Sequence, residues 1–173
     1  MPTLSQGTEL FLAKNINLFY RVAQVGFAAS LIVHLSTFFG LRATLDYFWF
    51  LHVGLFVVLI PALALTNYNQ PETSKSKIFN FGMEKSPGWL KLACIIFLIY
   101  AGINLILFLT AMGGGGPDFI GGKYVASSHG QIVREITESE YWHLKILEAR
   151  GFSGHWMVFY LVATSILHTQ KIK

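Results

Sequence analysis

The chain has 173 residues, of which 53% are hydrophobic, 15% aromatic and only 13% charged. Soluble domains usually carry about 25% charged residues, and a domain of this length could not bury so many apolar side chains. The composition therefore excludes a disordered chain and a soluble globule, and the single Cys excludes a disulfide-stabilised secreted scaffold. We expect a single membrane domain, 1–173, embedded in a lipid bilayer.

Four apolar segments predict membrane-spanning helices, because a bilayer core about 30 Å thick needs roughly 20 apolar residues. The expected spans are 18–40, 46–66, 89–112 and 153–169. The fourth is the shortest, so it crosses the core only with little tilt or as part of a longer helix. A segment before the first span, 8–17, is expected either as a short surface helix or as a frayed terminus. The predicted fold is an all-α integral membrane protein, a bundle of four transmembrane helices.

The distribution of Lys and Arg predicts the orientation of the chain. Four spans place both termini and the loop 67–88 on one side of the membrane, and the long loop 113–152 on the other. More Lys and Arg residues lie on the first side than on the second. The positive-inside rule therefore places both termini in the cytoplasm, in a bacterial-type inner membrane or a plasma membrane. This asymmetry explains the net charge of +4 without a nucleic-acid partner.

The long loop 113–152 is predicted to fold outside the membrane. Its Gly-rich start, 113–122, lacks the Gly-Lys-Ser/Thr ending of a phosphate-binding loop, and we expect a flexible exit from the third span there. Two β-prone runs around a Ser/Gly turn predict a small outer hairpin over 123–136. An isolated hairpin is only marginally stable, so it must pack on another element.

An amphipathic helix is predicted between this hairpin and the fourth span. Thr137 and Glu140 form a capping box at its start, and Gly151 ends it. Ser153 is then expected as the N-cap of the fourth span. We expect the partner-binding residues in the hairpin and this helix, at Tyr124, His129, Tyr141 and Trp142.

Histidines are the residues in which this sequence could carry chemistry. His34 and His52 lie equally far from the predicted outer ends of their spans, at roughly 9 Å depth for a rise of about 1.5 Å per residue. His155 enters the fourth span slightly nearer the surface. Equal depth on different helices suits a haem or metal site in a bundle. We therefore consider His34, His52 and His155 as ligands of haem b or of a transition metal.

A structural role for these histidines is the alternative. His34 could bond to the carbonyl of Ser30 or to a polar group on a neighbouring helix. His52 and His155 could belong to an interfacial belt of aromatic residues. The short turn between the first two spans holds their helices roughly 8–10 Å apart, which is narrow for a haem between two imidazoles.

The sequence leaves three classes of function open. The first expectation is an accessory or interaction subunit that docks another membrane protein, or a second copy of the chain, through its outer loop. The second is an electron-transfer or metal-binding subunit built on the histidines. The third is a small transporter, although the spans show no pair of broken helices. No catalytic residues stand out, because paired carboxylates in the spans and a nucleophile elbow are both missing, which favours a non-enzymatic protein.

Overall fold

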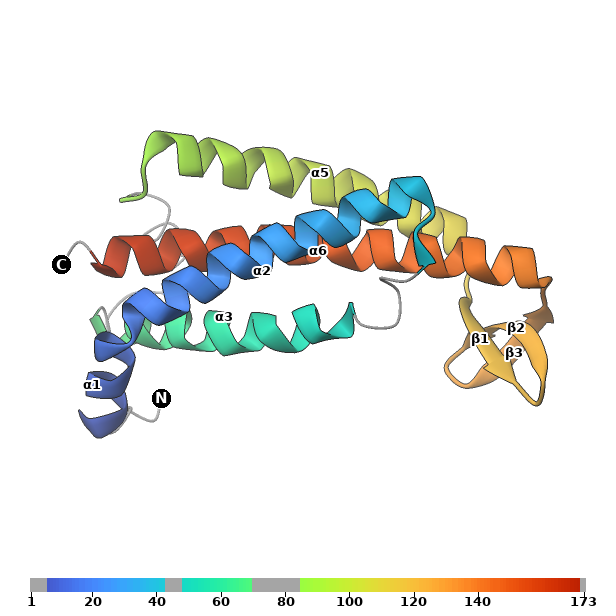
Figure 1. The fold of residues 1–173 in the computed structure, drawn as a ribbon, viewed down its shortest axis with the longest axis horizontal. Helices are drawn as coiled ribbons and strands as arrows, with labels where there is room; N and C mark the ends of the chain where they lie inside the picture. The colour runs from blue at the N-terminus through green and yellow to red at the C-terminus, as the bar shows by residue number, and fades with distance from the viewer. Residues whose placement is uncertain (1–5, 43–47, 70–84, 172–173) are drawn as a thin grey trace.

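The computed structural model describes residues 6–42, 48–69 and 85–171 (Figure 1). The predicted start of the second span at Asp46, and most of the loop predicted over 67–88, lie outside the described residues. The helices are α1 (Gln6–Lys14), α2 (Ile16–Ser36) with the 3₁₀ turn η1 (Thr37–Phe39), α3 (Trp49–Asn69), α5 (Gly88–Met112) and α6 (Glu138–Lys171). The strands are β1 (Gly116–Ile120), β2 (Lys123–Ser128) and β3 (Gln131–Glu135).

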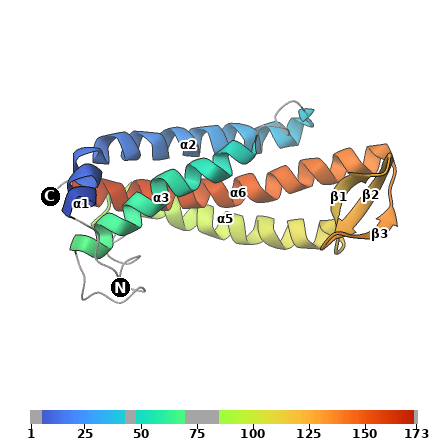
Figure 2. The ribbon, with the colours of Figure 1, turned by 90° about the horizontal axis from the view of Figure 1, so that it is seen from below.

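The long helix α6 is the axis of the molecule. The helices α2, α3 and α5 all pack against it, and the four helices run side by side (Figures 1 and 2). Its large side chains are the centre of the core: Trp156 and Tyr160 are each only 2% exposed. The first turns of α6 extend beyond α2 and α3 toward the sheet (Figure 2).

Apolar side chains cover the outward faces of the other three long helices. Examples that are more than half exposed are Val25, Ile32, Phe50, Ile60, Ile106 and Leu107. Polar side chains are instead buried between the helices, among them Ser30, His34, Asn104, Ser153 and Thr164. This arrangement is typical of membrane bundles, in which lipid surrounds the apolar side chains and polar residues join the helices.

Three segments are long and apolar enough to cross a membrane: Ile16–Phe39, Trp49–Thr66 and Gly88–Met112. They coincide with the first three predicted spans wherever the structure describes both. The chain is therefore a mostly helical membrane protein. Before the first of these segments, the predicted surface helix corresponds to α1.

A close approach of α2 and α6 depends on a glycine. A Cβ atom added to Gly26 would meet the ring of Tyr160, only 2.5 Å from Cζ. Tyr160 is held in this position because its hydroxyl donates to the carbonyl of Leu51 at 2.7 Å. One tyrosine of α6 thus touches α2 and bonds to α3.

The helix α6 is continuous where the sequence predicts two separate elements. The predicted start is confirmed, since the amide of Glu140 donates to Thr137 Oγ1 at 3.1 Å. The predicted stop at Gly151 and the N-cap at Ser153 are wrong, because both residues lie inside α6. The lack of a side chain at Gly151 allows α5 to pack closely against α6, since a Cβ there would lie 2.8 Å from the ring of Phe108 on α5.

The outer loop contains a three-stranded antiparallel sheet in the order β1–β2–β3, in place of the predicted two-stranded hairpin. The flexible exit predicted over 113–122 was wrong, because β1 lies there and pairs with β2. Both connections are two-residue turns, Gly121-Gly122 and His129-Gly130, and all four of these residues have positive φ. Positive φ at both central positions is typical of type I′ hairpins.

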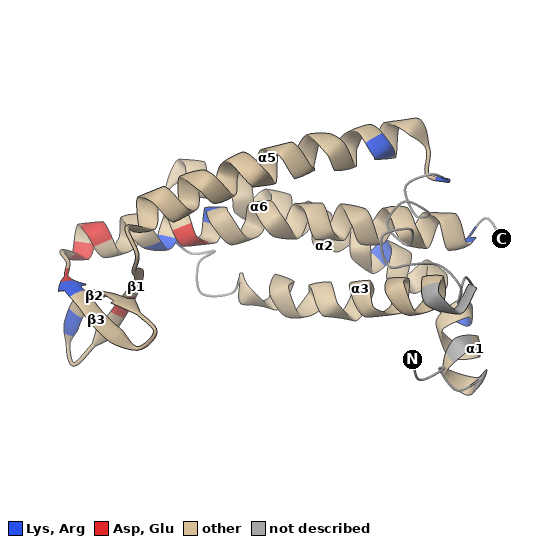
Figure 3. Cartoon of the chain, turned by 180° about the vertical axis from the view of Figure 1, so that it is seen from behind, with Lys and Arg blue, Asp and Glu red and all other residues tan. Residues whose placement is uncertain are grey.

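Charged residues gather at the two ends of the bundle (Figure 3). Lys and Arg residues lie at the end that carries the C-terminus, and the Asp and Glu residues coloured in the figure lie toward the sheet end together with further basic residues. Between the two ends the helices carry few charges, which leaves an apolar band along the outward faces.

Candidate functional site

His34 belongs to a buried polar network that joins α2, α5 and α6. Its Nδ1 lies 2.9 Å from Ser153 Oγ, and its Nε2 lies 2.5 Å from the hydroxyl of Tyr100. The Ser153 hydroxyl donates to the carbonyl of Arg150 at 3.3 Å. The Nδ1–H group of His34 therefore donates to Ser153 Oγ, and the Tyr100 hydroxyl donates to Nε2. Both ring nitrogens of His34 form hydrogen bonds to other helices. These contacts agree with the alternative in which His34 bonds to a polar group on a neighbouring helix.

Arg150 extends this network to the end of α2. Its Nε donates to Thr37 Oγ1 at 3.0 Å, and its Nη2 donates to the Thr37 carbonyl at 2.9 Å. The guanidinium also lies 4.2 Å from the centre of the Phe38 ring. From α5, Asn104 Nδ2 donates to the Arg150 carbonyl at 2.9 Å. These bonds join α2, α5 and α6 near the end of the bundle that carries the sheet.

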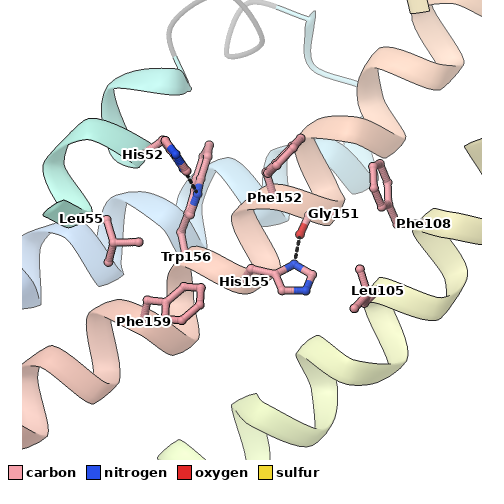
Figure 4. A pocket seen from close by; sticks show the side chains of 9 residues that line it. All are labelled: His52, Leu55, Leu105, Phe108, Gly151, Phe152, His155, Trp156 and Phe159. Atoms are coloured by element: carbon pink, nitrogen blue, oxygen red, sulfur yellow. Dashed lines mark hydrogen bonds between the residues drawn. The ribbon is translucent and has the colours of Figure 1, made fainter. Parts of the chain in front are cut away.

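His52 and His155 lie in a separate cavity between α3, α5 and α6, which we call the histidine groove (Figure 4). Its volume is about 300 Å³, and its other lining residues are Leu55, Leu105, Phe108, Gly151, Phe152, Trp156 and Phe159. The α6 residues at 152, 155, 156 and 159 share one face of the helix because of their spacing. The structure therefore brings His52 and His155 to one cavity and places His34 elsewhere, on α2, where it contacts Ser153 of α6.

The hydrogen bonds in the groove assign opposite roles to the two histidines. Trp156 Nε1 donates to His52 Nδ1 at 3.1 Å, and an indole only donates, so a neutral His52 carries its proton on Nε2. His155 Nδ1 lies 2.7 Å from the carbonyl oxygen of Gly151, which only accepts, so a neutral His155 has its lone pair on Nε2. The histidine groove thus offers one N–H donor and one nitrogen acceptor.

The sequence grouped His34, His52 and His155 as candidate ligands of haem b or of a transition metal. Among the described residues, no three His, Cys, Asp or Glu side chains are close enough to hold a metal ion. His155 has the protonation pattern of a typical ligand, with the proton on Nδ1 and the lone pair on Nε2, whereas His52 has the reverse pattern. Ligation of haem b or a metal by these residues stays a prediction.

Three of the four predicted partner-binding residues pack against other aromatic or core residues, and the fourth, His129, has a contact of 3.0 Å between its Nδ1 and Ser128 Oγ. The ring of Tyr124 lies 5.0 Å from that of Phe119 and 5.0 Å from that of Tyr141. Trp142 packs against the core of the bundle. These three residues attach the sheet to α6 and α6 to the bundle. His129 lies exposed in the turn between β2 and β3.

Ion pairs lie on the outer surface of the sheet. Lys123 pairs with Glu135 at 2.5 Å, and Arg134 pairs with Glu140 at 2.5 Å. The hydrogen bond and charge of Arg134 hold the pKa of the Glu140 carboxyl below its usual value. The second pair connects β3 with the first turn of α6.

Sequence patterns did not identify several residues that matter here. Tyr100 and Arg150 come from segments far from His34 in the chain, and no spacing relates them to it. Asn104 carried a usable signal, since it is a polar residue within the most apolar span and such residues usually face a helix interface. Ile132 and Val133 are exposed on β3, but in the sequence they belong to an ordinary β-prone run, which gives no sign of their exposure.

Comparison with known proteins adds no assignment, because no protein family, no curated protein and no solved structure matches the chain.

Proposed function

We propose that this chain is an integral membrane accessory subunit that crosses the bilayer four times and holds a partner protein with its outer sheet. The observation that carries the proposal is a pair of exposed apolar residues, Ile132 and Val133, on a sheet that is built rigidly onto α6 outside the apolar band. The two side chains are 54% and 53% exposed.

Support for a fourth span comes from the composition and burial of α6. Residues 151–170 contain no Asp, Glu, Lys or Arg, while Arg150 precedes them and Lys171 follows. At about 1.5 Å per residue this stretch is long enough for a core about 30 Å thick. Its Ser, Thr and Gly residues lower its hydropathy, but most of them are buried against the other helices. A helix that lies inside a bundle needs fewer apolar residues than one that faces lipid.

The charges support an orientation with the sheet outside. Counted along the sequence for four spans, eight Lys and Arg residues belong to the side of the termini and the loop 67–88, and five belong to the side of the sheet. The positive-inside rule then places the sheet on the outer side and both termini in the cytoplasm.

The sheet is a firm platform for a partner. Its central strand β2 is packed from both sides, with Val125 and Ala126 exposed by only 1% and 2%. The amide of Ile136 donates to the carbonyl of Tyr124 at 3.0 Å and closes the end of β3 onto β2. A partner would therefore meet a preformed surface and would not have to order it.

The exposed side chains of Ile132 and Val133, which we call the outer patch, are available for contact with a partner. The register between β2 and β3 shifts at Ala126 and Ser127, and such bulges oppose pairing with a further strand. The ion pairs Lys123–Glu135 and Arg134–Glu140 lie beside the patch. Protein interfaces commonly have this arrangement of an apolar centre and a polar rim. The partner we propose has an apolar contact surface with both charge signs around it.

Photo-crosslinking in native membranes tests the proposal. A benzoylphenylalanine at position 132 or 133 should give one discrete adduct with a different protein. The same residue at position 10 or 11 is the control, because Leu10 and Phe11 are 72% and 59% exposed at the opposite end of the bundle. Adducts with lipid alone, adducts of two copies of this chain, or equal products from both ends would overturn it.

A paired substitution measures the contribution of the outer patch. Ile132→Ser with Val133→Ser should lower recovery of that cross-linked partner at least about tenfold, because loss of apolar contacts at an interface centre costs more than about 1.4 kcal/mol. Leu10→Ser with Phe11→Ser removes comparable apolar area at the other end and should leave recovery unchanged.

A further inference from the structure

We propose that the histidine groove binds the ring of a lipid-soluble quinol. This site lies within the bundle and is independent of the outer patch. Its walls are mostly apolar and aromatic, and among its lining residues His52 and His155 each have one ring nitrogen, Nε2, that bonds to no described residue.

Access to the groove is from the lipid phase. Its walls come from α3 and α5, both long and apolar enough to cross a membrane, and its floor is α6 (Figure 4). Leu105 and Phe159 line the cavity and are also 38% and 44% exposed on the outward surface. A ligand would therefore enter between α3 and α5 from the bilayer. Its ring would lie in the cavity, and its tail would remain among the lipids.

The shape and lining of the groove suit a single flat ring. Its volume of about 300 Å³ is at the lower end of the range for small-molecule sites. The rings of Phe152 and Trp156 are stacked with centres 6.0 Å apart, and Phe108 lies 6.0 Å from Phe152. Aromatic side chains in this arrangement offer ring faces and edges to a planar ligand.

The two free nitrogens distinguish a quinol from other lipid-soluble molecules. Among the described residues, no side chain or carbonyl bonds to Nε2 of His52 or of His155. An acyl chain in the groove would leave both nitrogens without a hydrogen bond, which is unfavourable in an apolar environment. A quinone has only acceptors, so it can bond to the His52 N–H alone. A quinol hydroxyl also donates, so a quinol can bond to the lone pair on His155 Nε2, which a quinone cannot do.

Titration of the protein in phosphatidylcholine nanodiscs tests the site. The probes are a benzoquinone with a ten-carbon tail and its reduced quinol, and calorimetry measures binding above the partition into empty discs. We expect saturable binding of one molecule per chain, with the quinol about tenfold tighter because it makes one more hydrogen bond. Linear uptake equal to that of empty discs, or equal affinity for both probes, would overturn the proposal.

Two variants separate the hydrogen bond from the cavity. His155→Leu should bring the affinity for the quinol down to that for the quinone. His168→Leu is its control at the other end of α6, and it should preserve the difference. Leu105→Trp fills the groove from a partly exposed position and should abolish saturable binding of both probes. Binding that neither His155→Leu nor Leu105→Trp weakens would place the ligand elsewhere and refute the assignment. The thermal midpoint of each variant reports whether it is folded.

Discussion

His34 uses both ring nitrogens to join α2 to α5 and α6, through Tyr100 and Ser153. Removal of His34 would cost more than the average net contribution of a hydrogen bond to stability. The polar groups that bond to it would stay buried without a partner. His52 and His155 differ in that each keeps one nitrogen free toward the groove. At the scale of single residues, the histidines of the bundle therefore divide into a structural one and a pair suited to binding.

Replacement of His34 tests its structural role. His34→Ala should lower the free energy of unfolding by about 1–3 kcal/mol, because the hydroxyls of Tyr100 and Ser153 lose their partner. The measurement is an unfolding titration in mixed detergent micelles.

The matched control is His143→Ala on the exposed face of α6, which should change stability by less than about 0.5 kcal/mol. Equal stability of the two variants would show that the network contributes nothing measurable to the bundle.

Only part of this network was predictable from the sequence. A histidine inside a span indicates a polar contact within the bundle, and His34 makes one. Its partners were not predictable, because Tyr100 and Ser153 approach it only after three helices have packed. The grouping of His34 with His52 relied on equal depth, and depth along the helix axes says nothing about which face of α6 each residue meets.

At the scale of elements, the contact between α2 and α6 depends on the absence of a side chain at Gly26. Gly26→Ala should destabilise the bundle by about 1–3 kcal/mol, because the new methyl group overlaps with the ring of Tyr160 and the core is overpacked. Unfolding titration measures this change.

Gly102→Ala is the control on α5, where no atom lies within 4 Å of the added Cβ. It should leave the bundle unchanged or stabilise it by up to about 1 kcal/mol, since Ala is the better helix former. A Gly26→Ala protein as stable as Gly102→Ala would contradict the packing described here.

The attachment of β3 to α6 should depend on pH. Arg134 holds the pKa of Glu140 below its usual value of about 4.3. The pair therefore stabilises the sheet fully above that value, and this contribution is lost as pH falls through the lower pKa of the folded state. Hydrogen exchange of the β3 amides, corrected for intrinsic rates, should show protection that falls in this acidic range.

Glu140→Gln removes the titrating carboxylate and serves as the comparison. Its β3 amides should be less protected at neutral pH and should lose little further protection on acidification. A wild-type sheet whose protection is constant down to pH 3 would show that the ion pair does not hold β3.

The elements themselves were largely predictable, and the errors at Gly151 and in the Gly-rich segment have clear physical causes. Hydrophobic length alone located the helices α2, α3 and α5. Gly151 resembled a helix stop, but its lack of a side chain serves contact with Phe108. The Gly-rich segment resembled a flexible linker, yet Gly121-Gly122 provides the positive φ values of a tight hairpin turn.

At the scale of the whole molecule, the proposed topology depends on whether α6 crosses the membrane. Its polar residues face other helices, so low hydropathy does not oppose burial in the bilayer. With four spans, the outer sheet and the C-terminus lie on opposite sides. With three spans, α6 would lie along the membrane surface, and the sheet and the C-terminus would be on the same side of the membrane.

Labelling of single cysteines by an impermeant maleimide in intact cells decides between these topologies. In a Cys94→Ser background, cysteines at Gly7, Ser139 and Lys171 report the N-terminus, the start of α6 and its end; all three residues are exposed. Four spans predict that only the cysteine at Ser139 reacts before the cells are permeabilised. Reaction at Ser139 and Lys171 together, with protection at Gly7, would contradict the four-helix bundle.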